Sequence, residues 1–176
     1  AGFTHWAKLN NLKQAAKTMN FLTEHGISSY GELESKLTAI SARRDTAHTE
    51  IKRIESRSAE LALVMKHAGT YRQLKPLYER YRKSNDKEKF LRGHESEIIL
   101  FEAAARELKR LGAVPLPTTE SMKTELANLS AEKERLLAEY KTARTEAQKY
   151  ETVKQNVDAL LAVPKEQEQQ RRHELE

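Results

Sequence analysis

Two long stretches of this chain repeat apolar residues at alternating spacings of four and three, and this pattern constrains the fold more than any other feature. The first follows positions 33, 37, 40, 44, 47, 51, 54, 58, 61, 65 and 68. The second follows positions 122, 126, 129, 133, 136, 140, 143, 147, 150, 154, 157 and 161. Such heptad repeats are typical of helices that pack along one narrow apolar seam. At about 1.5 Å per residue, each helix would reach roughly 60 Å.

The segment between the two stretches turns the chain back, so antiparallel pairing would bury both seams within one molecule. We therefore predict an all-α fold: an elongated helical hairpin of two long antiparallel coiled-coil helices, with shorter helices packed at the ends. A composition of 32% charged and 38% hydrophobic residues, with few Gly and Pro, is typical of long helices. The same heptads also fit a dimer, because periodicity does not distinguish one hairpin from two paired chains. The presence of both seams in one chain favours the monomer.

Capping and turn residues place the boundaries of the predicted segments. Gly26 stands where a left-handed C-cap is expected. Ser28 or Ser29 caps the next helix, with Glu32 completing a capping box if Ser29 is the N-cap. Thr118 or Thr119 caps the last one. The predicted segments are an N-terminal amphipathic helix over 1–26, a long heptad helix over 28–84 kinked near Pro76, shorter returning helices over 85–112, a second long heptad helix over 118–163 and a polar tail over 164–176.

Some positions within these segments carry further expectations. The first helix should bury one face made of Phe3, Trp6, Leu9, Leu12, Ala16, Met19 and Leu22. Pro164 should interrupt or restart the last helix. The seam also has four polar members, which are expected to fix the register or to mark places where the helices splay: Arg44, Ser58, Lys133 and Lys154.

Composition limits the setting in which the chain works. It has no cysteine, which excludes disulfides and thiolate chemistry and fits a reducing cytosol. No apolar run approaches the roughly 18 residues needed to span a bilayer. We expect a cytoplasmic location without membrane insertion. Because the chain opens inside a helical pattern, we also expect it to be a piece of a longer protein.

The sequence offers no arrangement typical of an active site. The six histidines show neither zincin spacing nor a cluster with carboxylates, and no glycine-rich phosphate loop occurs. A nucleophile needs a base and an orienting group around it in a pocket, and a two-helix seam provides no such pocket. We therefore expect no catalytic residue, no metal and no cofactor.

The stretch from Tyr71 to Arg92 is the strongest local feature, because cations and aromatic residues alternate within it. Such a surface can hold phosphates and stack bases. Alternatively, the aromatic residues bury against the returning helix while the cations stay in water. The candidate nucleic-acid-binding residues are Arg72, Lys75, Tyr78, Arg80, Tyr81, Arg82, Lys83, Lys87, Lys89 and Arg92.

Several short motifs resemble the C-terminal helical region of relaxases from Gram-positive conjugative transposons, and together they cover nearly the whole chain. They are WAKLNNLKQAAKT at 6–18, FLTEHGI at 21–27 followed by Ser29 and Tyr30, YRK at 81–83 leading to KFL at 89–91, HE at 94–95 with IIL at 98–100, and NVDALL at 156–161.

The resemblance implies a non-catalytic accessory domain that helps to bind DNA, or relaxosome and coupling proteins, during mobilisation of a mobile element. The histidine triad and nucleophilic tyrosine of such enzymes lie in another domain, and no matching context occurs in this sequence. The alternative is a structural coiled-coil scaffold or spacer, which mediates protein–protein interaction without touching nucleic acid.

Overall fold

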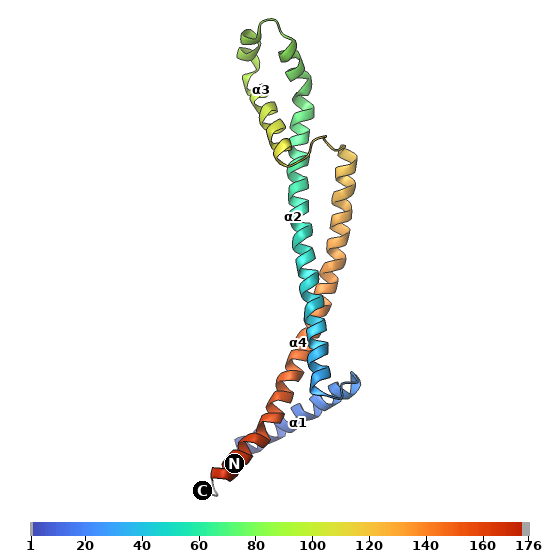
Figure 1. Ribbon diagram of the computed structural model, residues 1–176, viewed down its shortest axis with the longest axis vertical. Helices are drawn as coiled ribbons and strands as arrows, with labels where there is room; N and C mark the ends of the chain where they lie inside the picture. Colours follow the sequence, from blue (N-terminus) through green and yellow to red (C-terminus); the bar gives the residue numbers. More distant parts are fainter. Residues whose placement is uncertain (1, 174–176) are drawn as a thin grey trace. The chain divides into compact units, whose positions relative to one another are not determined.

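The computed structural model describes the backbone of residues 2–173 and the side chains of residues 10–162. Every regular element in that backbone is a helix: α1 (Gly2–Glu24), α2 (Tyr30–Lys83), α3 (Lys87–Arg110) and α4 (Thr119–His173) (Figure 1). The predicted all-α class is thus confirmed for the described part of the chain. The chain divides into two compact units. Unit 1 comprises the residues up to His48 together with those from Leu137 onward, and unit 2 comprises Thr49–Leu136.

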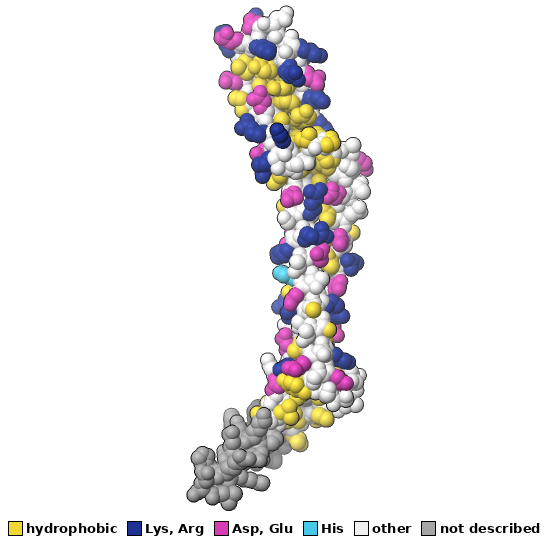
Figure 2. Space-filling model, in the orientation of Figure 1, with side chains coloured by type: hydrophobic (Ala, Val, Ile, Leu, Met, Phe, Trp, Pro, Cys, Tyr) yellow, Lys and Arg dark blue, Asp and Glu magenta, His cyan; other side chains and the backbone are white. Residues whose placement is uncertain are grey.

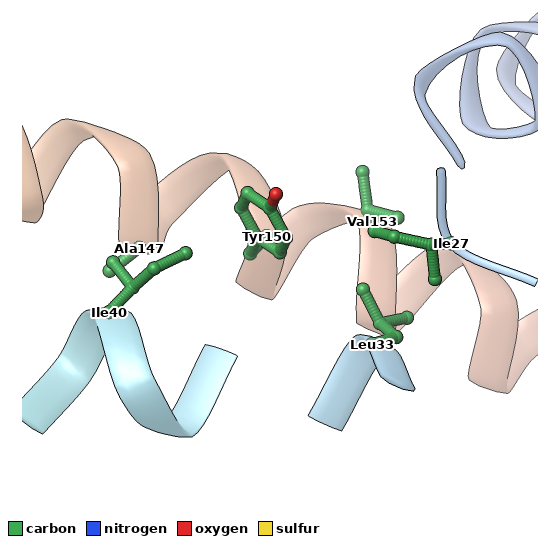
Figure 3. Packing of buried hydrophobic residues seen from close by; sticks show 6 residues of the cluster. All are labelled: Ile27, Leu33, Ile40, Ala147, Tyr150 and Val153. Carbon is green, nitrogen blue, oxygen red and sulfur yellow. The ribbon is translucent and has the colours of Figure 1, made fainter. Parts of the chain in front are cut away.

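The core of unit 1 joins α2, α4 and the connection between α1 and α2. Its buried members are Ile27, Leu33, Ile40, Ala147, Tyr150 and Val153. In Figure 3, Ile40 lies beside Ala147, Ile27 and Leu33 lie beside Val153, and Tyr150 lies between the two groups. The Tyr30 hydroxyl donates to Asp158 Oδ1 at 2.6 Å, and Arg43 forms an ion pair with Glu146. As residue numbers increase along α2, the residues that they contact on α4 have decreasing numbers. These two segments are therefore antiparallel within unit 1.

The core of unit 2 joins α2, α3 and α4. Its buried members are Leu61, Val64, Ala68, Leu108, Ala113 and Met122. Across α2 and α4, Lys133 Nζ lies 3.0 Å from Glu55 Oε1, and Arg57 Nε donates to Glu125 Oε1 at 2.7 Å. The α2 and α4 segments of unit 2 therefore also run antiparallel.

Side-chain caps begin α2, α3 and α4 at the places where the sequence requires them. The Glu32 backbone N–H donates to Ser29 Oγ at 3.2 Å, which makes Ser29 the N-cap of α2. Asp86 Oδ1 accepts from the Lys89 N–H at 2.9 Å and caps α3. Thr118 Oγ1 accepts from the Ser121 N–H at 3.1 Å and caps α4. Each polar cap satisfies a backbone donor that the first turn of a helix leaves without an intrahelical partner.

Two glycines end α1 and α3 in the left-handed region. Gly26 has a φ of 61°, and Gly112 has a φ of 68°. After Gly26, the Ile27 N–H donates to the Leu22 carbonyl at 2.8 Å, and after Gly112 the Ala113 N–H donates to Leu108 at 2.9 Å. These are Schellman motifs, which place an apolar residue directly against the helix that it follows. Ile27 and Ala113 consequently belong to the two cores.

The heptad seam of α2 is buried as the sequence predicts. Seven of its eleven positions are buried, and the other four are half-buried: Leu37, Arg44, Ser58 and Met65. The seam of α4 is buried or half-buried from Met122 to Val157, but its last position differs. Leu161 is 56% exposed, so the buried seam ends at Val157, one heptad position earlier than predicted.

The three charged seam residues, Arg44, Lys133 and Lys154, make surface ion pairs, two of them between helices. Hydrogen bonds from the ammonium groups of Lys133 and Lys52 lower the pKa of the Glu55 carboxyl. Lys154 Nζ on α4 lies 3.8 Å from Glu34 Oε1 on α2. Arg44 instead forms an ion pair with Asp45, its neighbour in the chain. Solvent-exposed pairs of this kind contribute little to stability. Their role in fixing the register stays a prediction.

The predicted apolar face of α1 is wrong for Leu12, Ala16 and Met19, which are exposed, whereas Leu22 is half-buried and packs against the core of unit 1 as predicted. Leu12 is 73% exposed and Met19 is 58% exposed, while Thr18 is only 2% exposed. The reason is that α1 contacts α4 through a polar and an aromatic pair: Asn156 Nδ2 donates to Thr18 Oγ1 at 3.2 Å, and the Phe21 ring meets Tyr150 edge-on at 5.1 Å. The side chains of Phe3, Trp6 and Leu9 lie outside the described set.

The helix interruptions that the sequence predicts have different outcomes in the structure. The shorter returning helices form α3, which is kinked at the non-helical residue His94 (φ −140°, ψ 26°), directly after Gly93. Pro76 lies inside α2, which continues to Lys83, and the kink expected there stays a prediction. The backbone of α4 continues past Pro164 to His173, so the predicted end at 163 is wrong. A proline removes one backbone hydrogen bond but has a φ that a helix accepts.

Candidate nucleic-acid interface

The basic–aromatic surface, defined as residues 71–92, comprises the end of α2, the start of α3 and the turn between them. The Ser84 hydroxyl donates to the Asp86 carbonyl at 3.0 Å, and the Asp86 carboxylate caps α3. This three-residue turn brings α3 back beside α2 (Figure 1). Two cation-bearing helix ends are thereby held next to each other within unit 2.

The aromatic residues of this surface form a ladder of ring contacts between α2 and α3. Tyr71 and Tyr78 both stack on Phe101 of α3, with centroid distances of 4.8 and 4.2 Å. The ring centroid of Tyr81 lies 6.0 Å from that of Tyr78 and 6.1 Å from that of Phe90. These rings are half-buried, and Phe101 is 6% exposed. The ladder is thus the apolar contact that holds the two helices together here.

Phe101 is the ladder residue that the candidate set lacks. The sequence places it in the apolar stripe of the returning helix, outside the basic stretch, and no local pattern ties it to Tyr71 or Tyr78. Only the fold brings the three rings together. The ladder continues to His94, whose ring centroid lies 4.8 Å from that of Phe90.

The cations of the surface point into solvent, and most have no partner among the described residues. No hydrogen bond or ion pair within residues 10–162 engages the side-chain charges of Lys75, Arg80, Arg82, Lys83, Lys87 and Lys89, all of which are exposed. Figure 2 shows Lys and Arg side chains gathered with some acidic ones around the α2–α3 end. Unpaired and exposed cations are the groups that a polyanion can neutralise.

Two of the candidate cations have partners in the fold. Arg72 donates from Nη1 to Thr119 Oγ1 at 2.7 Å and from Nη2 to the Pro117 carbonyl at 2.5 Å. It therefore fixes the start of α4 against α2 and is less available to a ligand. Arg92 lies 3.4 Å from Glu88 one turn away, and both side chains are highly exposed. That weak pair leaves Arg92 open to competition from a phosphate.

The net charge of the whole chain is concentrated in the basic–aromatic surface. Eight of the 31 basic residues and three of the 26 acidic residues lie within 71–92. The remaining 23 residues of each sign cancel, so the net charge of +5 arises within this one surface. Counting charges along the sequence identifies the segment, whereas only the structure shows which cations are unpaired.

Elsewhere, the described chain has a groove between α1 and α4 and a smaller pocket between α2 and α4, which is lined by Arg44, Asp45, His48, Tyr140, Arg144, Gln148 and Glu151. No group of three or more His, Cys, Asp or Glu side chains able to hold a metal occurs among the residues that the structure describes. The groove between α1 and α4, of 510 Å³, is lined by amides, hydroxyls and two lysines, with no carboxylate or histidine. Within the described helices, none is both long enough and apolar enough to cross a bilayer.

Comparison with known proteins does not place the chain in a family. No family model matches this sequence, and no curated protein or solved structure is similar enough to it to indicate a relative. The basic–aromatic surface is therefore the feature of the described chain that bears most directly on function.

Proposed function

We propose that this chain is a non-catalytic accessory domain of a conjugative-transfer relaxase, which binds DNA through the basic–aromatic surface during mobilisation of a mobile element in a bacterial cytoplasm. The observation that carries the proposal is a group of six exposed cations on two neighbouring helix ends, in the segment that holds the net charge of the chain, and none of the six has a partner among the described residues. Positive charge gathered on one face is the electrostatic footprint of a nucleic-acid-binding protein.

The proposed architecture serves that role by presenting the surface on a helical support. In each unit, segments of α2 and α4 run antiparallel with their heptad positions buried, which supports an antiparallel coiled-coil hairpin as the arrangement of the two helices. Helices joined along an apolar seam need few residues from outside it. The remaining surfaces stay available for relaxosome or coupling proteins, which the relaxase-like motifs suggest as further partners.

A structural scaffold or spacer is the second candidate, and one observation favours it. The aromatic residues of the surface are engaged in the ladder between α2 and α3, as expected if they serve the fold and the cations only keep that face in water. Under this reading the domain binds proteins and is indifferent to nucleic acid.

The experiment that separates the two candidates is fluorescence anisotropy of labelled DNA with this chain at two salt concentrations. If about six phosphates are contacted, affinity should fall roughly a thousandfold between 50 and 200 mM salt. The triple variant Arg80→Ala, Arg82→Ala and Lys83→Ala should lose most of the binding.

The matched control removes three exposed cations from α4: Lys141→Ala, Arg144→Ala and Lys149→Ala. It changes the net charge by the same amount but leaves the basic–aromatic surface intact. Equal losses in the two triple variants would show that binding is non-local, and absence of binding at 50 mM salt would leave the scaffold as the function.

A further inference from the structure

We infer that the basic–aromatic surface takes double-stranded DNA through its phosphates and does not stack unpaired bases. The inference rests on the proposed function and narrows it to one form of nucleic acid. It follows from two properties of the same surface: its aromatic rings are engaged within the protein, whereas six of its eight cations make no hydrogen bond or ion pair among the described residues.

The rings already have partners where bases would need to stack. Surfaces that bind single strands without sequence preference stack successive bases on aromatic faces. Here Phe101 has Tyr71 and Tyr78 stacked on it at 4.8 and 4.2 Å, with interplanar angles of 22° and 25°. The Phe90 ring lies 4.8 Å from that of His94. Base stacking on these rings would have to displace contacts that join α2 to α3.

The Tyr78 hydroxyl is also turned toward the protein. It lies 3.5 Å from Glu102 Oε1, at the long limit of a hydrogen bond. Tyr81 is half-buried and is the tyrosine nearest the turn. Its ring centroid lies 6.0 Å from that of Tyr78 and 6.1 Å from that of Phe90. Tyr81 is therefore the ring whose substitution tests stacking most directly.

The cations lie on both helices that flank the turn. Lys75 and Arg82 are seven residues apart and lie on one side of α2. Lys87 and Lys89 lie in the first turn of α3. A duplex presents one negative charge per about 1.7 Å of its axis, so a surface with free charges and no free rings gains more from a duplex than from a single strand.

The test compares a duplex with a single strand of the same sequence and length, by anisotropy over a series of salt concentrations. If the six unpaired cations each neutralise one phosphate, the slope of log K against log salt should be about −5 for the duplex. The duplex should bind more tightly than the single strand. The Arg80→Ala, Arg82→Ala and Lys83→Ala triple variant should reduce the slope by about three.

The substitution Tyr81→Leu keeps an apolar side chain at the helix contact but removes the ring. It should leave duplex affinity unchanged, with Phe90→Leu as a second variant and circular dichroism to verify helix content. Tighter or equal binding of the single strand, or a loss of about fivefold or more with Tyr81→Leu as expected for a stacked base, would overturn the inference but keep the proposed function. Absence of binding to either DNA would overturn the proposed function itself. The wild-type comparison of duplex with single strand decides the matter even if both variants unfold.

Discussion

Asn156 on α4 donates a hydrogen bond of 3.2 Å to Thr18 on α1, and Thr18 is 2% exposed. This polar pair, next to the Phe21–Tyr150 ring contact, determines which side of α1 faces α4. The apolar residues Leu12 and Met19 consequently lie in solvent. The orientation of α1 thus depends on a specific hydrogen bond, although the sequence pattern favours an apolar face.

The Thr18–Asn156 pair should matter more to stability than the exposed leucine. Thr18→Val keeps the shape of the side chain but leaves the half-buried Asn156 amide without its acceptor, which should lower the free energy of unfolding by about 1 kcal/mol. Leu12→Gln, at a position that is 73% exposed, should change it by less than about 0.5 kcal/mol. Urea unfolding followed by circular dichroism measures both. A larger loss with Leu12→Gln would show that α1 packs through the other face.

The capping box of α2 should make stability depend on pH. The Ser28 backbone N–H donates to Glu32 Oε2 at 2.7 Å, and this bond lowers the pKa of Glu32 below its ordinary value of 4.5. Because the folded pKa is depressed, the stabilisation is present above pH 4.5 and is lost as pH falls through the folded pKa.

The variant Glu32→Gln removes this titration with little change in shape. It should be less stable than the wild type at pH 7, and the difference should shrink as the pH falls below about 4.5. Thermal unfolding over a pH series measures this difference. Glu134→Gln is the control, because Glu134 is exposed on α4 and makes no hydrogen bond or ion pair with the described residues. A difference for Glu32→Gln that stays constant with pH would mean that the charge of the carboxylate is irrelevant to the cap.

Two glycines of unit 2 should respond in opposite directions to alanine. Gly112 has a φ of 68°, and an added Cβ would meet no atom within 4 Å, so the cost of Gly112→Ala is only that of the left-handed backbone. That cost is roughly 1–2 kcal/mol. Gly69 lies in the interior of α2 with equally open surroundings, and Gly69→Ala should stabilise by about 0.5–1 kcal/mol. Urea unfolding of both variants checks the signs, and a shift in the same direction for both would contradict the assigned backbone roles.

Local residue patterns determine the helices and most of the seam. Ser29, Asp86 and Thr118 cap helices because a short polar side chain can reach the backbone donors of the first turn. Ile54, 0% exposed, and Ala143, also 0% exposed, are buried at heptad positions because each long helix packs mainly along one stripe. These features depend on neighbours within a few residues, so the sequence is sufficient to predict them.

The candidate site could be predicted only in part. The run of cations and aromatic residues over 71–92 is visible in the sequence, as is its excess charge. The sequence does not show which of these residues are engaged within the protein and which are free. Phe101 contacts Tyr78 and Pro117 contacts Arg72, but both partners are distant in the chain. The sequence alone leaves both readings of the stretch open, and the fold shows the rings engaged while six cations are unpaired.

The sequence by itself determined that this protein is helical, where its helices begin, and which stripe of α2 is buried. The tertiary structure alone decided that Thr18 is buried while Met19 is exposed, that Phe101 completes the ladder, and that Arg72 is held by the start of α4. The physical reason is the range of the interactions. Caps and heptads act over one or two helical turns, whereas a hydrogen bond such as Thr18–Asn156 joins residues 138 positions apart and exists only once the chain has folded.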